Sequence, residues 1–243
     1  MSEALKAVLL RLRIKLFMDG ANIDEMRQGY KDGLVAGFTT NPTLMRKAGI
    51  KDYEAFAREA LAAIPDLPIS FEVFSDDFES MEHEARTIAA WGPNTNIKIP
   101  VTNTKRESSA PLIKKLSADG LSLNVTAVFS LDQVRTVSKA LNPDVPSIVS
   151  IFAGRIADSG QDPVPLMTEA ASILADNPKA ELLWASPREL LNLFQADACN
   201  CHIITATQSI ISKLKHVGKD LEDFSLETVQ MFYDDAQAAG YRI

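Results

Sequence analysis

Short apolar runs alternate with amphipathic segments along the chain. Each run has the length of a strand that is buried on both faces, as in a parallel sheet. The runs predict eight strands, at residues 14–18, 34–38, 69–74, 96–99, 121–129, 147–152, 181–184 and 201–205.

The amphipathic segments repeat apolar residues at helical spacing. Several carry helix start and stop signals: Asp77, Ser130 and Ser186 as N-caps, Pro187 at a first helical position, and Gly120 as a left-handed C-terminal cap. The pattern predicts helices at residues 22–31, 52–64, 77–91, 108–118, 131–141, 164–176, 187–194, 209–215 and 225–239.

Regular alternation of strands and helices predicts a parallel sheet built of βαβ units. Eight units of roughly 30 residues fill the 243 residues and would close a (β/α)8 TIM barrel. The alternative is a doubly wound open sheet, but its usual glycine-rich motifs, G-x-G-x-x-G or G-x-x-x-x-G-K-[ST], do not occur here. We therefore expect one α/β domain over residues 14–243, including a C-terminal helix at 225–239, and an amphipathic helical extension at residues 1–13.

Polar residues occupy alternate positions of these strands, where a buried parallel strand should be apolar. Because side chains alternate between the two faces of a strand, the polar residues of each strand share one face. In a barrel that face points to the interior, and most of these residues stand near the carboxyl ends of the strands, where barrel enzymes keep their active sites. We expect a cavity there, lined by Asp19, Thr39, Asn41, Ser70, Glu72, Asn96, Lys98, Asn124, Thr126, Ser150 and Ser186.

Lys98 lies in the middle of an apolar strand, N-I-K-I-P. A buried ammonium is costly unless it is paired or neutral, and a neutral lysine amine attacks carbonyl groups to form a Schiff base. Asp19 and Glu72 should project into the same cavity, where one could pair with the lysine and the other move protons. The alternative is a lysine on a frayed or edge strand whose ammonium reaches solvent.

Two arginines follow the sixth and seventh predicted strands. Arg155 comes directly after Gly154, and Arg188 follows Ser186-Pro187, where a helix is expected to begin. Guanidinium groups and free backbone N–H groups at a helix start bind anions, and many barrels hold phosphate after these strands. The alternative for each arginine is a solvated surface position, but together they favour a phosphate site.

The overall charge and cysteine content narrow the class of protein further. With 25 basic and 32 acidic residues, the net charge of −7 argues against a nucleic-acid partner or an anionic membrane surface. No apolar run approaches the ~20 residues that span a bilayer, and the first residues make a poor signal peptide. Cys199 and Cys201 form neither a disulfide framework nor a zinc set, so we expect reduced thiols in a cytoplasmic protein.

At the level of motifs, the chain resembles the transaldolase family of class I aldolases from about residue 14 to its C-terminus. The pair T-T-N-P after the second strand and I-K-I-P on the fourth is the most specific part of the resemblance. The matching stretches are FMDGAN (17–22), GFTTNPTL (37–44), SFEVFS (70–75), NIKIPVT (96–102), NVTAVFS (124–130), SIFAGRI (150–156) and WASPREL (184–190).

The resemblance implies a (β/α)8 barrel with Lys98 as the Schiff-base lysine. It implies that Asp19, Glu72 and Thr126 hold a catalytic water and shuttle protons. It also implies sugar phosphates as substrates, no metal or organic cofactor, and a homo-oligomer.

Substrate-binding positions carry over from the family in the same way. Thr39 and Asn41 match residues that line the active site, and Ser150 matches a residue that contacts the dihydroxyacetone end of the substrate. The positions that match the phosphate-binding set are Arg155, Ser186 and Arg188.

Two activities compete within this family. Transaldolases transfer a dihydroxyacetone unit between sugar phosphates, whereas the related fructose-6-phosphate aldolases release it free. The aldolases typically have glutamine at the position of Glu72 and tyrosine at the position of Phe152, so this chain resembles the transaldolases. Ile151 departs from the S-P-F form of many transaldolases. A third hypothesis, a non-catalytic sugar-phosphate-binding barrel, predicts loss of the lysine or its carboxylates, and all are present.

Overall fold

The computed structural model describes residues 11–243, so most of the extension predicted at residues 1–13 lies outside the described residues. Residues 12–211 form one compact unit, and residues 212–243 belong to a second.

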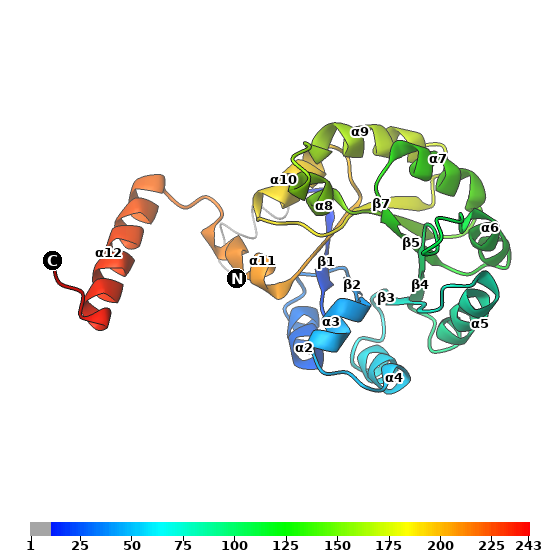
Figure 1. The fold of residues 1–243 in the computed structure, drawn as a ribbon, viewed down its shortest axis with the longest axis horizontal. Coiled ribbons are helices and arrows are strands. Elements are labelled where there is room, and N and C mark those ends of the chain that lie inside the picture. The colour runs from blue at the N-terminus through cyan, green and yellow to red at the C-terminus, as the bar shows by residue number, and fades with distance from the viewer. Residues whose placement is uncertain (1–10) are drawn as a thin grey trace. The chain divides into compact units, whose positions relative to one another are not determined.

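Eight strands close into a barrel in the unit of residues 12–211, in the order of the chain (Figure 1). Each strand is parallel to its neighbours, and β1 pairs with both β2 and β8. The predicted (β/α)8 fold is confirmed, and the open sheet is excluded by closure. The strands are β1 (Lys15–Asp19), β2 (Gly37–Thr39), β3 (Ile69–Glu72), β4 (Thr95–Pro100), β5 (Leu123–Val128), β6 (Ser147–Ile151), β7 (Ala180–Trp184) and β8 (Ile203–Ala206).

Helices follow the strands and cover the outside of the barrel (Figure 1). Ser130 forms a capping box with Gln133, and Asp77 accepts a hydrogen bond from the Ser80 N–H, so these two predicted caps are confirmed. The helices are α2 (Ile23–Lys31), α3 (Pro42–Lys47), α4 (Tyr53–Ala63), α5 (Phe78–Ala89), α6 (Ala110–Ala118), α7 (Leu131–Ala140), α8 (Ala153–Asp158), α9 (Pro163–Leu174), α10 (Leu191–Ala198) and α11 (Gln208–Ile211).

The helix predicted at residues 187–194 begins only at Leu191, and Ser186 is not its N-cap. Ser186 has a left-handed backbone, with φ of 59°. The Asn192 side chain accepts hydrogen bonds from the backbone N–H groups of Arg188 and Glu189, at 2.7 and 3.1 Å. The prediction is wrong because Asn192 satisfies these N–H groups from inside the helix, which leaves the Ser-Pro signal unused.

Apolar side chains fill the amino-terminal half of the barrel interior. Phe17, Ile148, Leu183 and Ile203 form one buried cluster there. A Cβ on Gly37 would lie 2.5 Å from the Phe17 ring, so only glycine leaves room for this ring. The cluster forms a packed floor below the polar side chains at the carboxyl ends of the strands.

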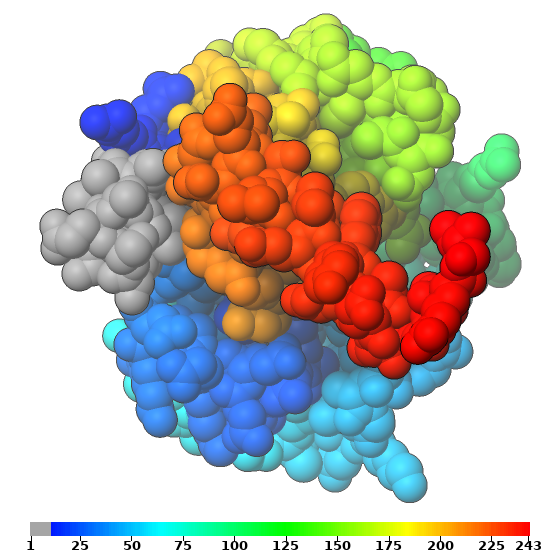
Figure 2. All heavy atoms as spheres, turned by 90° about the vertical axis from the view of Figure 1, so that its left-hand side faces the viewer, coloured from blue at the N-terminus to red at the C-terminus, as the bar shows by residue number. Residues whose placement is uncertain are grey.

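The second unit contains a short 3-10 helix, η1 (Ser212–His216), and the helix α12 (Leu221–Ala239), which is orange to red in Figure 2. Asp220 caps α12 through the N–H groups of Glu222 and Asp223, so the helix begins before the predicted residue 225. No residue of α12 is buried. Among residues 11–243, no helix combines the length and hydropathy that crossing a membrane requires.

Candidate active site

A cavity of about 480 Å³ opens at the carboxyl ends of the barrel strands. It is the place where the sequence predicts the active site. All but two of the residues expected there line it; Ser70 and Asn96 are not among its lining residues. Loops after the strands add further lining residues, among them Lys47 and Ala127. The candidates brought together are Asp19, Thr39, Asn41, Glu72, Lys98, Thr126, Ser150, Phe152, Arg155, Ser186 and Arg188.

Lys98 is buried at the base of this cavity, with 6% of its surface exposed. It pairs in register with Glu72 of the neighbouring strand, and its Nζ lies 3.1 Å from the Glu72 Oε2. Nζ also donates a hydrogen bond to the Thr40 carbonyl oxygen, at 2.8 Å. A closed barrel has no edge strand, so the alternative of an edge lysine that reaches solvent is excluded.

The short strand β2 explains why the Thr40 carbonyl is free to accept this hydrogen bond. β2 ends at Thr39, and Asn41 already caps helix α3 by accepting from the Leu44 N–H at 3.0 Å. Thr40 still donates its N–H to the Ser70 carbonyl oxygen at 3.2 Å, but no residue of β2 pairs with β3 beyond Ser70. Early termination of one strand thus supplies an acceptor for the Lys98 ammonium and leaves the backbone of Glu72 to be satisfied in another way.

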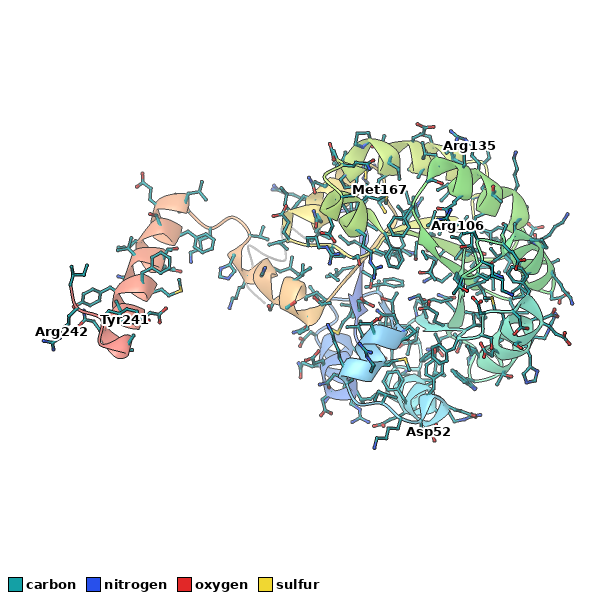
Figure 3. All side chains as sticks on the ribbon, in the orientation of Figure 1. Asp52, Arg106, Arg135, Met167, Tyr241 and Arg242 are labelled. Atoms are coloured by element: carbon teal, nitrogen blue, oxygen red, sulfur yellow. The ribbon has the colours of Figure 1, made fainter. Side chains whose placement is uncertain are left out.

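Tyr53 satisfies the backbone of Glu72. Its hydroxyl accepts a hydrogen bond from the Glu72 N–H at 2.7 Å and donates one to the Glu72 carbonyl oxygen at 3.0 Å. Asp52, labelled in Figure 3, caps helix α4 and so sets Tyr53 at its first position. The ring packs against aromatic neighbours such as Trp91, and burial raises the pKa of the phenol, which keeps it protonated. The strand pattern gave no signal for Tyr53, because it lies on a helix.

Asp19 is held on the opposite side of the cavity by hydroxyl groups. Thr39 donates a hydrogen bond to the Asp19 Oδ1 at 2.8 Å, and Thr205 Oγ1 lies 2.6 Å from Thr39 Oγ1. Burial raises the pKa of Asp19; the nearby Lys98 and the hydrogen bond from Thr39 act against this rise, and Glu72 adds to it. Thr205 was missed, although a polar residue in alternation with Ile203 on strand β8 was a usable signal.

Asn124 links three strands at the wall of the cavity. It accepts a hydrogen bond from the Ser150 hydroxyl at 2.6 Å and donates one to the Ser70 hydroxyl at 3.0 Å. All three side chains are buried. A buried polar network that is satisfied internally is rigid, so Ser150 is held in one orientation.

A bulge in β5 turns two consecutive residues toward the cavity. The register with β6 shifts between Val125 and Val128, and Ala127 has a positive φ of 58°. Thr126 and Ala127 both line the cavity, which a regular strand does not allow. Backbone strain of this kind persists where the surroundings fix it, and here it adds width to the cavity wall.

The two predicted phosphate-binding loops pack directly on each other. A Cβ on Gly154 would lie 1.5 Å from the Ser186 carbonyl oxygen, so this close approach requires glycine. Arg155 lies over the Phe152 ring, 5.2 Å from its centroid. The loops after β6 and β7 thus bring both arginines to one end of the cavity.

Arg188 is already engaged by a carboxylate. Its guanidinium forms a two-point ion pair with Asp158, with Nε 3.0 Å from Oδ1. The backbone N–H groups of Arg188 and Glu189 donate to the Asn192 side chain, so they are not free to bind the anion expected at this helix start. An anion at this end of the cavity would be held by the arginine side chains.

Fold and cavity together define a class: a parallel eight-stranded α/β barrel with a buried lysine and two acids at the carboxyl ends of its strands. Within this class, a family model described as Transaldolase/Fructose-6-phosphate aldolase matches residues 16–243, and the chain belongs to this family of enzymes.

Individual proteins that are similar to this chain have names that agree with this family. The chain is 35% identical to a "Probable transaldolase" of Dehalococcoides mccartyi over 202 residues, which cover 83% of this chain and 90% of that one. It is 33% identical to a "Probable transaldolase" of Thermoanaerobacter sp. over 231 residues, which cover 95% of this chain and 100% of that one. A solved structure of a designed, cube-shaped protein cage resembles it in fold, with a TM-score of 0.56 at 13% identity, covering 95% of this chain and 78% of that one.

Proposed function

We propose that this protein is a transaldolase. It transfers a dihydroxyacetone unit from sedoheptulose 7-phosphate to glyceraldehyde 3-phosphate, giving erythrose 4-phosphate and fructose 6-phosphate. The observation that carries the proposal is the buried contact of 3.1 Å between Lys98 and Glu72 at the base of the cavity. An amine with a carboxylate beside it can lose its proton to that carboxylate and attack a carbonyl group.

The first half-reaction begins at Lys98. Its Nζ adds to the C2 carbonyl carbon of the ketose phosphate, and loss of water leaves an iminium between Nζ and C2. Glu72 and Thr126 hold the water and move its protons, and both line the cavity with Lys98. The iminium then withdraws electrons from the bond that will break.

Asp19 breaks the C3–C4 bond. It takes the proton of the C4 hydroxyl, and the electron pair of that O–H bond forms the carbonyl of the leaving aldose phosphate. The electron pair of the C3–C4 bond forms the C2=C3 double bond while the iminium nitrogen becomes neutral. The retained enamine attacks the aldehyde of the second aldose phosphate, and the same steps in reverse release the product. Every proton moves through side chains of this chain, so the mechanism uses no metal or organic cofactor.

The substrate is held between the lysine and the arginines. Ser150, fixed by Asn124, contacts the dihydroxyacetone end, and Thr39 and Asn41 line the wall beside Asp19. The phosphate lies at the opposite end, on Ser186, Arg155 and Arg188. We propose further that the protein acts in the cytoplasm as a homo-oligomer. Sedimentation velocity tests the assembly, and the mass of a single chain would contradict it.

A fructose-6-phosphate aldolase is the second candidate, since the family includes both activities. Glu72 and Phe152 support transfer, because aldolases of this family typically have glutamine and tyrosine at these positions. The experiment is incubation with fructose 6-phosphate, with and without added aldose phosphate acceptor, while free dihydroxyacetone and the new ketose phosphate are both quantified. Transfer predicts product only with the acceptor. Release of free dihydroxyacetone as fast as transfer would contradict the proposal.

Replacing Phe152 by Tyr should raise the share of aldol cleavage by about tenfold. A phenol at the cavity wall adds a proton donor that can protonate the enamine carbon and let dihydroxyacetone leave. Phe129→Tyr is the matched control, since Phe129 stacks on Phe152 at 5.7 Å but does not line the cavity. An unchanged product ratio in Phe152→Tyr would count against the role given to this position.

A further inference from the structure

A row of two hydroxyl groups leads from strand β8 to the Asp19 carboxylate. Thr205 Oγ1 lies 2.6 Å from Thr39 Oγ1, which donates to the Asp19 Oδ1 at 2.8 Å. Thr205 and Thr39 line the cavity but are only 5% and 2% exposed, so little of either side chain is open to solvent. The three residues lie on β8, β2 and β1, which are neighbours in the barrel.

The direction of the hydrogen bonds follows from the number of hydrogen atoms. An ionised carboxylate only accepts hydrogen bonds, so the single hydroxyl hydrogen of Thr39 must point to Asp19. Thr39 can then only accept from Thr205, whose own hydrogen must point to Thr39. Each bond in such a row polarises and strengthens the next one.

We propose that Thr205 is a positioning residue for the Asp19 carboxylate. By donating to Thr39, it keeps the Thr39 hydroxyl directed at Oδ1, so that Oδ1 remains an acceptor and the proton taken from the substrate is carried on Oδ2. The proposal rests on the proposed function for the role of Asp19 as base, but the hydroxyl row itself is a property of the structure.

Nearby charges, hydrogen bonds and burial together determine the pKa of Asp19. Lys98 on β4 favours its ionised form, Glu72 on β3 opposes it, and Asn41 after β2 adds a hydrogen bond to it. Burial is the largest influence, and it raises the pKa of Asp19. Thr205 adds no charge. Its removal weakens one hydrogen bond to the ionised form, so the pKa of Asp19 should rise further.

The test uses four variants. Thr205→Val removes the hydroxyl at nearly constant shape, and Thr205→Ser keeps it. Thr95→Val is the matched control, because Thr95 is equally buried on a barrel strand and its hydroxyl has no hydrogen-bond partner among the described residues. Thr205→Ala serves as a second deletion of the hydroxyl if the valine variant does not fold.

We expect the acidic limb of the kcat/KM profile to move up by about 0.5 to 1 pH unit in Thr205→Val. At pH 7, kcat should fall about threefold while KM for the sugar phosphate stays unchanged. The pH profiles of Thr205→Ser and Thr95→Val should both coincide with that of the wild type. A purely structural role for Thr205 would lower Tm without moving the limb.

A second readout does not depend on activity. The carboxyl carbon of Asp19 can be titrated by NMR in the full chain, with the signal assigned by its loss in Asp19→Asn. The Asp19 midpoint should rise in Thr205→Val or Thr205→Ala and stay in place in Thr95→Val. Equal midpoints in the wild type and the Thr205 deletions, or an equal rise in Thr95→Val, would overturn the proposal. Failure of the proposed function would appear separately, as wild-type protein without catalytic activity.

Discussion

Two lysine–glutamate pairs link strands at opposite ends of the same barrel. At the amino end, Lys15 on β1 pairs with Glu181 on β7 at 2.6 Å, with side chains 43% and 34% exposed. At the carboxyl end, Lys98 on β4 pairs with Glu72 on β3 at 3.1 Å, with side chains 7% and 18% exposed. The exposed pair has the shorter contact and the smaller consequence, because water screens it. The proposed role of Lys98 as a nucleophile therefore rests on an ion pair that is also buried, and an ion pair alone would not support it.

Polar groups are also used differently at the two ends. At the amino end they satisfy the backbone: the Asn94 amide donates to the Ile64 and Leu67 carbonyl oxygens, and the Leu182 N–H donates to the His202 ring. At the carboxyl end, side chains bond to one another and border a cavity, as Thr39 and Asp19 do. This difference agrees with the general rule for α/β barrels, in which groups at the amino end contribute to stability and catalytic groups stand at the carboxyl end.

The largest difference between the ends should come from replacing the two lysines. Lys98→Met should lower kcat/KM by about 10⁴-fold or more, because the covalent step needs a buried amine and Lys47, the other lysine that lines the cavity, is exposed. Lys15→Met should leave activity within about twofold of the wild type and change the free energy of unfolding by about 1 kcal/mol or less. Steady-state kinetics and urea unfolding measure both. Comparable activity of Lys98→Met and Lys15→Met would show that the reaction does not depend on Lys98.

The two glutamates give the next largest effect. Glu72→Gln should lower the transfer rate by about 10²-fold, since the amide cannot accept the lysine proton or move protons on water. It should also cost about 1–3 kcal/mol of stability, because a buried ammonium loses its charged partner. Glu181→Gln is the control and should change neither the transfer rate nor the stability appreciably. Equal losses of transfer rate and stability in Glu72→Gln and Glu181→Gln would show that the loss of either ion pair has the same effect, and that Glu72 has no special role.

A smaller effect is expected from two tyrosines. Tyr53→Phe keeps the ring packing but removes the partner of two backbone groups of Glu72, so kcat should fall about tenfold and stability by about 1–2 kcal/mol. Tyr30 also uses its hydroxyl in one hydrogen bond, to Asp66 at 2.7 Å, but on the exposed surface. Tyr30→Phe should therefore change stability by about 0.5 kcal/mol or less and leave kcat unchanged. A wild-type kcat in Tyr53→Phe would show that the two hydrogen bonds from Tyr53 are not needed to hold Glu72 in its position.

The fold and most of the cavity could be predicted from the sequence, because both depend on the alternation of side chains with a period of two along each strand. Once the strands are parallel and closed, Glu72 and Lys98 must face the same interior, and they pair in register as expected. The parts that escaped prediction depend on tertiary contacts. Tyr53 reaches the site from a helix, the Thr40 carbonyl is exposed by the early end of β2, and Asn192 displaces the helix start that Ser186 signalled. Such contacts leave no periodic trace in the sequence.

The central claim is that Lys98 forms a covalent intermediate with the ketose. Reduction with borohydride in the presence of fructose 6-phosphate, followed by peptide mass mapping, tests it directly, and Lys15 in the same digest is an internal control. A reduced dihydroxyacetone adduct is expected on the peptide that contains Lys98, and none on the peptide that contains Lys15. An unmodified Lys98, or equal modification of both lysines, would contradict it.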